Sequence, residues 1–227
     1  MMLFLHGALG TAAQFEWLRP HLPPGWATHA LQLPGHGGLP AHQPFSLPLF
    51  ADAVLAFLEK QGIQSADFFG YSMGGYLALW MAAHHPQRVR KVLTLNTKLE
   101  WNPDMAARMG PMFDPEKIEA KAPQLAQALA SQHAPADWRQ VAARTADFLH
   151  DLGKGKGLAA ADWASIECPV LLLRGDADST VSAEETRQVA LALPHGTYAE
   201  LANSRHSLEQ VDGVAVGAAA EAFFSRT

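Results

Sequence analysis

The chain alternates short apolar runs with segments of helical periodicity, and this alternation constrains its fold more than any other feature. Nearly uninterrupted apolar runs are typical of parallel strands that are covered on both faces. The pattern therefore predicts an α/β fold in three layers, with a mostly parallel sheet of about six strands between helices. The expected strands are residues 3–5, 28–33, 66–69, 89–95, 170–173 and 198–201.

Helical periodicity occupies the segments between these runs. An apolar stripe over residues 47–60 predicts one helix, and a second is expected over 73–85. Ser182 and Glu185 have the spacing of a capping box, so a third helix is expected to begin after Ser182. A last helix is expected from about residue 208 to residue 224.

The stretch from residue 99 to residue 160 interrupts this alternation of strand and helix patterns, because it contains no strand pattern. Asp114 and Pro115 have the pattern of an N-cap followed by proline at the first helical position. A second helix is expected to begin near Pro135. We therefore expect a helical insertion at residues 99–160 between the two parts of one core, residues 1–98 and 161–227.

The composition is that of an ordinary globular protein. Hydrophobic residues make up 48% of the chain, charged residues make up 17%, and the formal net charge is −5. A mildly acidic chain without a run of Lys or Arg has no electrostatic basis for binding nucleic acid. The sequence shows neither a signal-peptide pattern nor an apolar stretch long enough to span a bilayer, so we expect a cytoplasmic protein without membrane partners. Cys168 is the only cysteine, which excludes an internal disulfide.

The strongest local motif is Gly-Tyr-Ser-Met-Gly-Gly at residues 70–75, which follows a predicted strand and begins a predicted helix. A serine in such a turn is forced into strained backbone angles, and glycines two residues to either side prevent a collision. The hydroxyl of Ser72 would then project above the sheet, beside helix N–H groups suited to a developing oxyanion. A serine in an ordinary glycine-rich turn is the alternative, but the flanking strand and helix favour a nucleophile.

Two further motifs resemble those of the α/β-hydrolase superfamily. Residues 6–10, His-Gly-Ala-Leu-Gly, follow the first strand and are similar to the His-Gly turn of that family. Residues 33–37, Leu-Pro-Gly-His-Gly, resemble the loop after the family's next strand. The resemblance implies a shortened core that lacks the first two strands, with the insertion as a cap over the active site. His6 and His36 are expected to be structural.

The same resemblance assigns the oxyanion hole. In the family, one N–H comes from the residue after the His-Gly pair and the other from the residue after the nucleophile. Carried over, these donors are the backbone N–H groups of Ala8 and Met73.

A serine hydroxyl needs a base to become a nucleophile, and the base needs a carboxylate to orient it. The family order is serine, acid, histidine. His206 lies where the family has its base, whereas its rival, His195, precedes the last strand. Residues 174–178, Arg-Gly-Asp-Ala-Asp, resemble the family's Gly-x-x-Asp and select Asp178 as the acid. Asp176 is the alternative and is expected to brace the loop.

Aromatic and methionine side chains of the insertion suit an apolar acyl pocket, although packing between cap helices accounts for most of them equally well. Lys98 and Arg205 are candidates to hold a carboxylate. The residues expected to line the substrate pocket are Tyr71, Trp101, Lys98 and Arg205.

No zinc motif, P-loop or dinucleotide-binding glycine motif occurs, so we expect neither a metal nor a cofactor. The prediction is a monomeric or homodimeric serine hydrolase that cleaves a small or medium carboxylic ester or thioester through an acyl-serine intermediate. Two alternatives stay open: a C–C hydrolase or lyase with the same three residues, and a ligand-binding protein without turnover. A fold alone does not decide between these.

Overall fold

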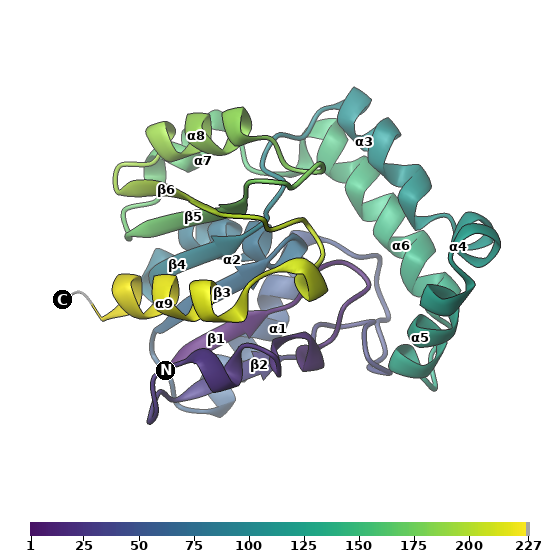
Figure 1. Ribbon diagram of the computed structural model, residues 1–227, viewed down its shortest axis with the longest axis horizontal. Helices are drawn as coiled ribbons and strands as arrows, with labels where there is room; N and C mark the ends of the chain where they lie inside the picture. The colour runs from purple at the N-terminus through teal and green to yellow at the C-terminus, as the bar shows by residue number, and fades with distance from the viewer. Residues whose placement is uncertain (226–227) are drawn as a thin grey trace.

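The computed structural model describes residues 1–225 and contains a six-stranded sheet flanked by helices (Figure 1). The strand order is β2-β1-β3-β4-β5-β6, and every neighbouring pair is parallel. The carboxyl ends of all six strands therefore lie at one edge of the sheet. The strands are β1 (Met2–Leu5), β2 (Thr28–Leu31), β3 (Ala66–Tyr71), β4 (Val89–Leu95), β5 (Val170–Gly175) and β6 (Gly196–Leu201).

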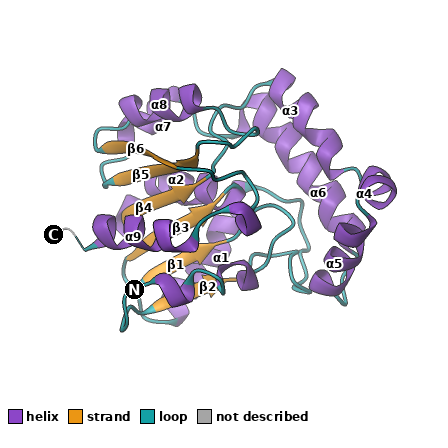
Figure 2. Ribbon diagram, viewed as in Figure 1, coloured by secondary structure: helices purple, strands orange, loops and turns teal. Residues whose placement is uncertain are grey.

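Helices connect the strands on both sides of this sheet (Figure 2). The α-helices are α1 (Leu47–Lys60), α2 (Met73–His84), α3 (Pro103–Met109), α4 (Pro115–Lys121), α5 (Pro123–His133), α6 (Trp138–Asp151), α7 (Ala160–Ser165), α8 (Ala183–Ala192) and α9 (Gly213–Phe224). Short 3₁₀ turns are η1 (Ala12–Phe15), η2 (Arg19–His21), η3 (Pro86–Arg88), η4 (Gly110–Phe113) and η6 (Leu208–Gln210), and η5 (Leu152–Lys156) is a π-helical turn. The predicted three-layer α/β fold is confirmed.

The two faces of the sheet are covered by separate apolar layers. Leu3 and Leu5 belong to a core cluster that includes α1, α2, α7 and α8, whereas Met2 and Phe4 belong to a cluster with η1 and α9. This alternation is the period of two expected of a strand, because successive side chains point to opposite faces. Burial on both faces explains why the inner strands β1 and β5 are nearly all apolar, whereas the edge strands β2 and β6 are partly exposed and contain polar residues.

The segment between β4 and β5 places α3, α4, α5 and α6 beyond the carboxyl edge of the sheet (Figure 1). It has a small apolar cluster of its own, made by Ile118, Ala126, Leu129, Trp138 and Ala142. Phe148 on α6 packs into the main core. Asp114 caps α4 as predicted, whereas α6 begins at Trp138, after its N-cap Asp137, rather than near Pro135.

The predicted start of the last helix is wrong. Residues 208–210 form only the 3₁₀ turn η6, and α9 begins at Gly213. The side chain of Asp212 accepts hydrogen bonds from the N–H groups of Val214 and Ala215, which fixes the helix start at that point. The capping box of Ser182 and Glu185 is present at the start of α8, as predicted.

Two buried histidines join β1 to the loop after β2. The Nε2 of His6 accepts a hydrogen bond from the N–H of Leu33 at 3.1 Å, while its Nδ1 donates to the carbonyl of Gly7 at 2.9 Å. His36 donates through Nδ1 to the carbonyl of Pro34 at 3.1 Å. Burial lowers the pKa of His6 to about 4, and burial next to His6 holds the pKa of His36 well below its usual value. Both rings are therefore neutral and structural at neutral pH.

We predict that the free energy of unfolding falls as the pH is lowered from 7 to 5. In the unfolded chain His6 and His36 bind protons near pH 6.5, whereas in the folded chain they stay neutral. As the pH falls, these two histidines therefore bind protons in the unfolded chain before they do so in the folded chain. Their contribution to the free energy of unfolding is complete above pH 6.5, and it is lost as the pH falls toward their lower pKa values in the folded chain. Each histidine contributes at most about 1.4 kcal/mol per pH unit.

Urea unfolding at pH 7, 6 and 5 measures this dependence above the range in which most carboxylates titrate. Replacement of the exposed His42 by Gln is the control, and it should leave the pH dependence as it is. An unfolding free energy that is constant between pH 7 and pH 5 would contradict the assignment of neutral, buried rings.

Candidate active site

Ser72 lies in the turn between β3 and α2, with φ 50° and ψ −117°. This left-handed conformation is rare for a residue with a side chain, and the surrounding glycines make room for it. A Cβ atom on Gly70 would lie 2.4 Å from the carbonyl oxygen of Gly74, and one on Gly74 would lie 2.0 Å from that of Leu5. Larger residues at these positions would push α2 away from β1 and β3, as the motif indicated.

Ser72, His206 and Asp178 form a chain of hydrogen bonds at the carboxyl edge of the sheet. The Oγ of Ser72 lies 3.2 Å from the Nε2 of His206, and the Nδ1 of His206 lies 2.8 Å from the Oδ2 of Asp178. The three residues follow β3, β6 and β5, respectively. Because Asp178 is an acceptor, His206 donates through Nδ1, which leaves Nε2 free to accept the hydroxyl proton of Ser72.

The carboxylate of Asp178 is buried yet stays ionised. Its Oδ1 accepts hydrogen bonds from the N–H groups of Thr180 at 2.7 Å and Val181 at 3.0 Å. Burial alone would raise the pKa of Asp178, but the hydrogen bond and charge of His206, together with these two N–H groups, hold the pKa below its usual value. The site therefore has a fixed negative charge behind the imidazole.

The two alternative residues lie elsewhere. The Oδ1 of Asp176 accepts a hydrogen bond from the N–H of Ser204 at 3.2 Å, so this exposed carboxylate braces the loop that leads to His206. His195 precedes β6 at the amino edge of the sheet, where its carbonyl accepts from the N–H of Val170 at 3.0 Å. It is therefore remote from the carboxyl edge, where Ser72 lies.

Tyr71 and Asn96 hold the loop of His206 in place. The Oη of Tyr71 donates to the carbonyl of His206 at 2.9 Å, and burial raises the pKa of Tyr71, so the hydroxyl keeps its proton. The Nδ2 of Asn96 donates to the carbonyls of Arg205 at 2.7 Å and His206 at 3.2 Å, while its Oδ1 accepts from the N–H of Gly175 at 2.7 Å. One buried amide thus joins the loops after β5 and β6. This function of Asn96 could not be predicted from the sequence, because an asparagine after a strand has no distinctive pattern.

A small pocket of about 30 Å³ adjoins Ser72. Five of the predicted site residues, Ser72, Ala8, Met73, Lys98 and Trp101, line it together with Tyr76, Met109, Phe113, Phe148, Leu149 and Leu152. Tyr71 and Arg205 are outside this set, because the Tyr71 hydroxyl is turned to the His206 carbonyl and Arg205 is exposed. This volume is far below the roughly 300–1,000 Å³ of typical ligand pockets.

The backbone N–H groups of Ala8 and Met73 have no hydrogen-bond acceptor within the part of the chain that the structure describes. Met73 is the first residue of α2, where N–H groups lack an intrahelical partner. Both N–H groups belong to residues that line the pocket with Ser72. They are thus available to an oxygen atom bound beside the serine.

His133 ties the insertion to the turn that contains Ala8. At the end of α5, its Nε2 donates to the carbonyl of Leu9 at 3.0 Å, and its Nδ1 accepts from the N–H of Gly37 at 3.0 Å. The amide of Gln132 donates to the same Leu9 carbonyl at 3.3 Å. Burial lowers the pKa of His133, which favours the neutral ring that this pair of hydrogen bonds requires.

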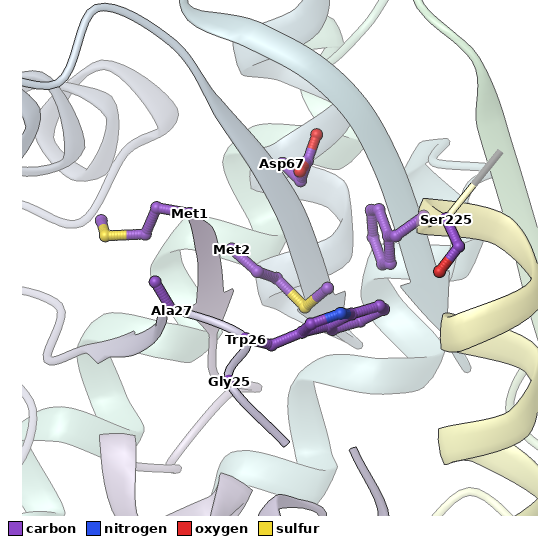
Figure 3. A pocket seen from close by; sticks show the side chains of 8 residues that line it. Met1, Met2, Gly25, Trp26, Ala27, Asp67 and Ser225 are labelled. Atoms are coloured by element: carbon purple, nitrogen blue, oxygen red, sulfur yellow. The ribbon is translucent and has the colours of Figure 1, made fainter. Parts of the chain in front are cut away.

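A larger hollow of about 280 Å³ lies at the amino edge of the sheet (Figure 3). Its walls include Met2, Trp26 and Asp67, and the Asp67 carboxylate is paired with Arg90 at 2.6 Å. None of the residues that line it is a histidine, so it contains no base for a nucleophile. The pocket beside Ser72 is the candidate active site despite its smaller volume, because Ser72 begins the hydrogen-bonded chain to His206 and Asp178.

Across residues 1–225, no cluster of three or more His, Cys, Asp or Glu side chains has an arrangement that could hold a metal ion. In the same residues, none of the helices combines the length and the apolar character needed to cross a bilayer.

Comparison with known proteins gives both a family and named relatives. Residues 1–135 match the family model described as "alpha/beta hydrolase fold". A pimeloyl-[acyl-carrier protein] methyl ester esterase of Neisseria meningitidis is 42% identical over 88 residues, which are 39% of this chain and 33% of that protein. An esterase of the same name from Aeromonas hydrophila is 30% identical over 201 residues, which are 79% of this chain and 78% of that protein. The chain thus matches about a third of the Neisseria relative's length.

Solved structures agree on the fold. A serine hydrolase from Cycloclasticus zankles superposes with a TM-score of 0.82 at 16% identity, covering 98% of this chain and 89% of that one. A 2-hydroxy-6-oxo-6-phenylhexa-2,4-dienoate hydrolase from a Rhodococcus species superposes with a TM-score of 0.81 at 18% identity, covering 99% and 90%. At such low identity these structures establish the architecture alone.

We predict that Asn96→Ala lowers the free energy of unfolding by about 2–4 kcal/mol, because it leaves the Gly175 N–H and two carbonyls without their buried partner. Urea unfolding measures the change. The matched control is Gln188→Ala on the exposed face of α8, which should change the free energy by less than about 0.5 kcal/mol. An equally small effect of Asn96→Ala would show that the amide does not hold the two loops together.

Proposed function

The chain belongs to the α/β-hydrolase fold family, and on this basis we propose that it is a serine esterase with Ser72 as nucleophile, His206 as base and Asp178 as acid. The hydrogen-bonded chain from the Ser72 hydroxyl through His206 to the Asp178 carboxylate carries this proposal. Nucleophile, base and orienting carboxylate in that order are the arrangement that makes a serine hydroxyl reactive at neutral pH.

In the proposed reaction, the Ser72 oxygen attacks the ester carbonyl while its proton passes to the Nε2 of His206. The charge of Asp178 stabilises the imidazolium that forms. The N–H groups of Ala8 and Met73 bind the oxyanion of the tetrahedral intermediate, where each donor contributes about 2.7–4 kcal/mol. His206 then returns the proton to the departing alcohol. Water hydrolyses the acyl-Ser72 with His206 again acting as base.

The proposed substrate is a carboxylic ester of a small alcohol. Two relatives are named as methyl ester esterases, and methanol is the smallest alcohol that an ester can release. The pocket of about 30 Å³ beside Ser72 has room for a group of that size but not for an acyl chain as well. We therefore propose that residues 99–160 act as a cap and that helices α3 and α6 move apart from the core to admit the acyl chain.

A fluorophosphonate probe tests the nucleophile. We predict that the wild-type protein is labelled on the peptide that contains Ser72, that Ser72→Ala is not labelled, and that His206→Ala is labelled far more slowly, because the serine then lacks its base. In-gel detection and peptide mapping measure the labelling. Labelling of Ser72→Ala at the wild-type rate would exclude Ser72 as the nucleophile. Failure of unreacted wild-type protein to hydrolyse any methyl ester, although the probe labels Ser72, would exclude an esterase.

A pair of aspartate variants tests the acid. We predict that Asp178→Asn lowers kcat for a methyl ester by roughly 10⁴-fold, because the imidazole loses the group that orients its tautomer. Asp176→Asn is the matched control: it weakens one loop contact, so it should lower the unfolding temperature while kcat stays within about tenfold of wild type. Steady-state kinetics and thermal unfolding separate the two effects. A larger loss of kcat in Asp176→Asn than in Asp178→Asn would reverse the assignment.

A further inference from the structure

Lys98 is the one charged residue among those that line the pocket beside Ser72. The other walls are largely apolar and come from the insertion and from α2. In pockets of this kind, a few polar groups within apolar walls fix the orientation of the ligand and determine specificity. A buried cation in such a wall is therefore a candidate for substrate recognition.

The side chain of Lys98 is only 6% exposed, and its Nζ donates to the carboxylate of Glu185 on α8. That carboxylate is already well supplied with donors, since it also accepts from the N–H of Leu99 at 3.0 Å and from the hydroxyl of Ser182 at 3.2 Å. An ammonium group has three N–H donors, and Glu185 is the one acceptor found for Lys98 in the described chain. Glu185 balances the charge of Lys98 but does not use all three N–H donors of the Lys98 ammonium group.

Trp101, which also lines the pocket, has a second donor without a partner. Its indole Nε1 is buried and has no hydrogen-bond partner among the described residues. A buried N–H without an acceptor is unfavourable, and a tryptophan N–H in an apolar environment usually has a partner. An oxygen atom of a bound molecule would provide the acceptor that the protein does not.

Stability alone gives no reason for a buried ion pair in this wall. Removing two charges from water costs several kcal/mol, and apolar side chains of similar size often stabilise a fold as well as the ion pair does. The neighbouring wall residues Met109, Phe113 and Phe148 are of that apolar type. The position of Lys98 is better explained by a ligand that uses its remaining donors.

We propose that Lys98 and Trp101 form a subsite that binds an oxygen acceptor on the acyl chain of the ester. This inference rests on the proposed esterase function and names its substrate class: acyl chains that carry an oxo or ester carbonyl beyond the scissile bond. Because Glu185 already neutralises Lys98, the subsite has no net charge, so a neutral carbonyl binds without an excess charge to balance. A carboxylate in the same place would compete with Glu185 for the ammonium group.

The test compares three families of methyl esters with equal chain lengths: alkanoates, oxoalkanoates with the oxo group at each position from C4 to C7, and monomethyl esters of dicarboxylic acids. For at least one position, wild-type kcat/KM is expected to be about tenfold or more higher for the oxoalkanoate than for the alkanoate, which is the effect of one hydrogen bond to a charged donor. The dicarboxylic monoester of that length is expected to be poorer than the oxoalkanoate. A preference for the dicarboxylic monoesters would overturn the neutral subsite.

In Lys98→Met, the oxoalkanoate preference is expected to fall to less than about twofold. Since this change leaves Glu185 buried without its partner, the same ratio is measured in Lys98→Met/Glu185→Gln, with Glu185→Gln alone as the matched background. Lys121→Met, on the exposed surface of α4, should retain the wild-type preference. A preference that survives loss of Lys98 in a folded variant would show that the ion pair is only structural, and would overturn the proposal.

Trp101→Phe provides an independent test if the Lys98 variants do not fold, because it removes the N–H and keeps an aromatic ring. It should reduce the same preference severalfold, and an unchanged ratio would overturn the contribution of the indole. Ser72-dependent hydrolysis of the alkanoates without any preference for oxygen would overturn the subsite and leave the esterase proposal standing. Failure to hydrolyse any of the esters would overturn both.

Discussion

The left-handed backbone of Ser72 is the constraint on which the rest of the site depends. A residue with a side chain adopts φ 50° and ψ −117° only when the surrounding structure compensates for the strain. Here α2 lies so close to β1 that a Cβ atom on Gly74 would collide with the Leu5 carbonyl, and the Thr97 hydroxyl donates to the Ser72 carbonyl at 3.1 Å. The close packing that holds the turn also directs the hydroxyl away from the sheet and places it at the start of a helix.

The parallel sheet explains how residues more than one hundred positions apart meet at this turn. All six strands end at the same edge, so the parallel sheet itself brings the loops after β3, β5 and β6 together. The sheet alone does not determine the exact position of His206. Tyr71 and Asn96 supply that position through hydrogen bonds to the backbone of the loop. Buried amide and phenol groups of this kind are costly unless paired, so each one also specifies a single arrangement.

The sheet, its parallel order and the serine turn could be predicted because each follows from local pattern: apolar runs, glycine spacing and chain order. Contacts between distant segments could not. Glu185 was identified only as a capping residue, yet its carboxylate also pairs with Lys98, which is 87 positions away. The start of α9 was placed too early because η6 and the helix share one apolar pattern, and only the cap at Asp212 separates them.

We propose that Ser72 attacks a carbonyl whose oxygen accepts hydrogen bonds from the backbone N–H groups of Ala8 and Met73. A crystal structure of the protein after reaction with an alkyl fluorophosphonate tests this claim most directly. We expect a covalent bond from the Ser72 Oγ to phosphorus, with one phosphonyl oxygen within hydrogen-bond distance of both N–H groups and the His206 ring retained on Asp178. Phosphorus bound to another residue, or a phosphonyl oxygen directed away from both N–H groups, would contradict it.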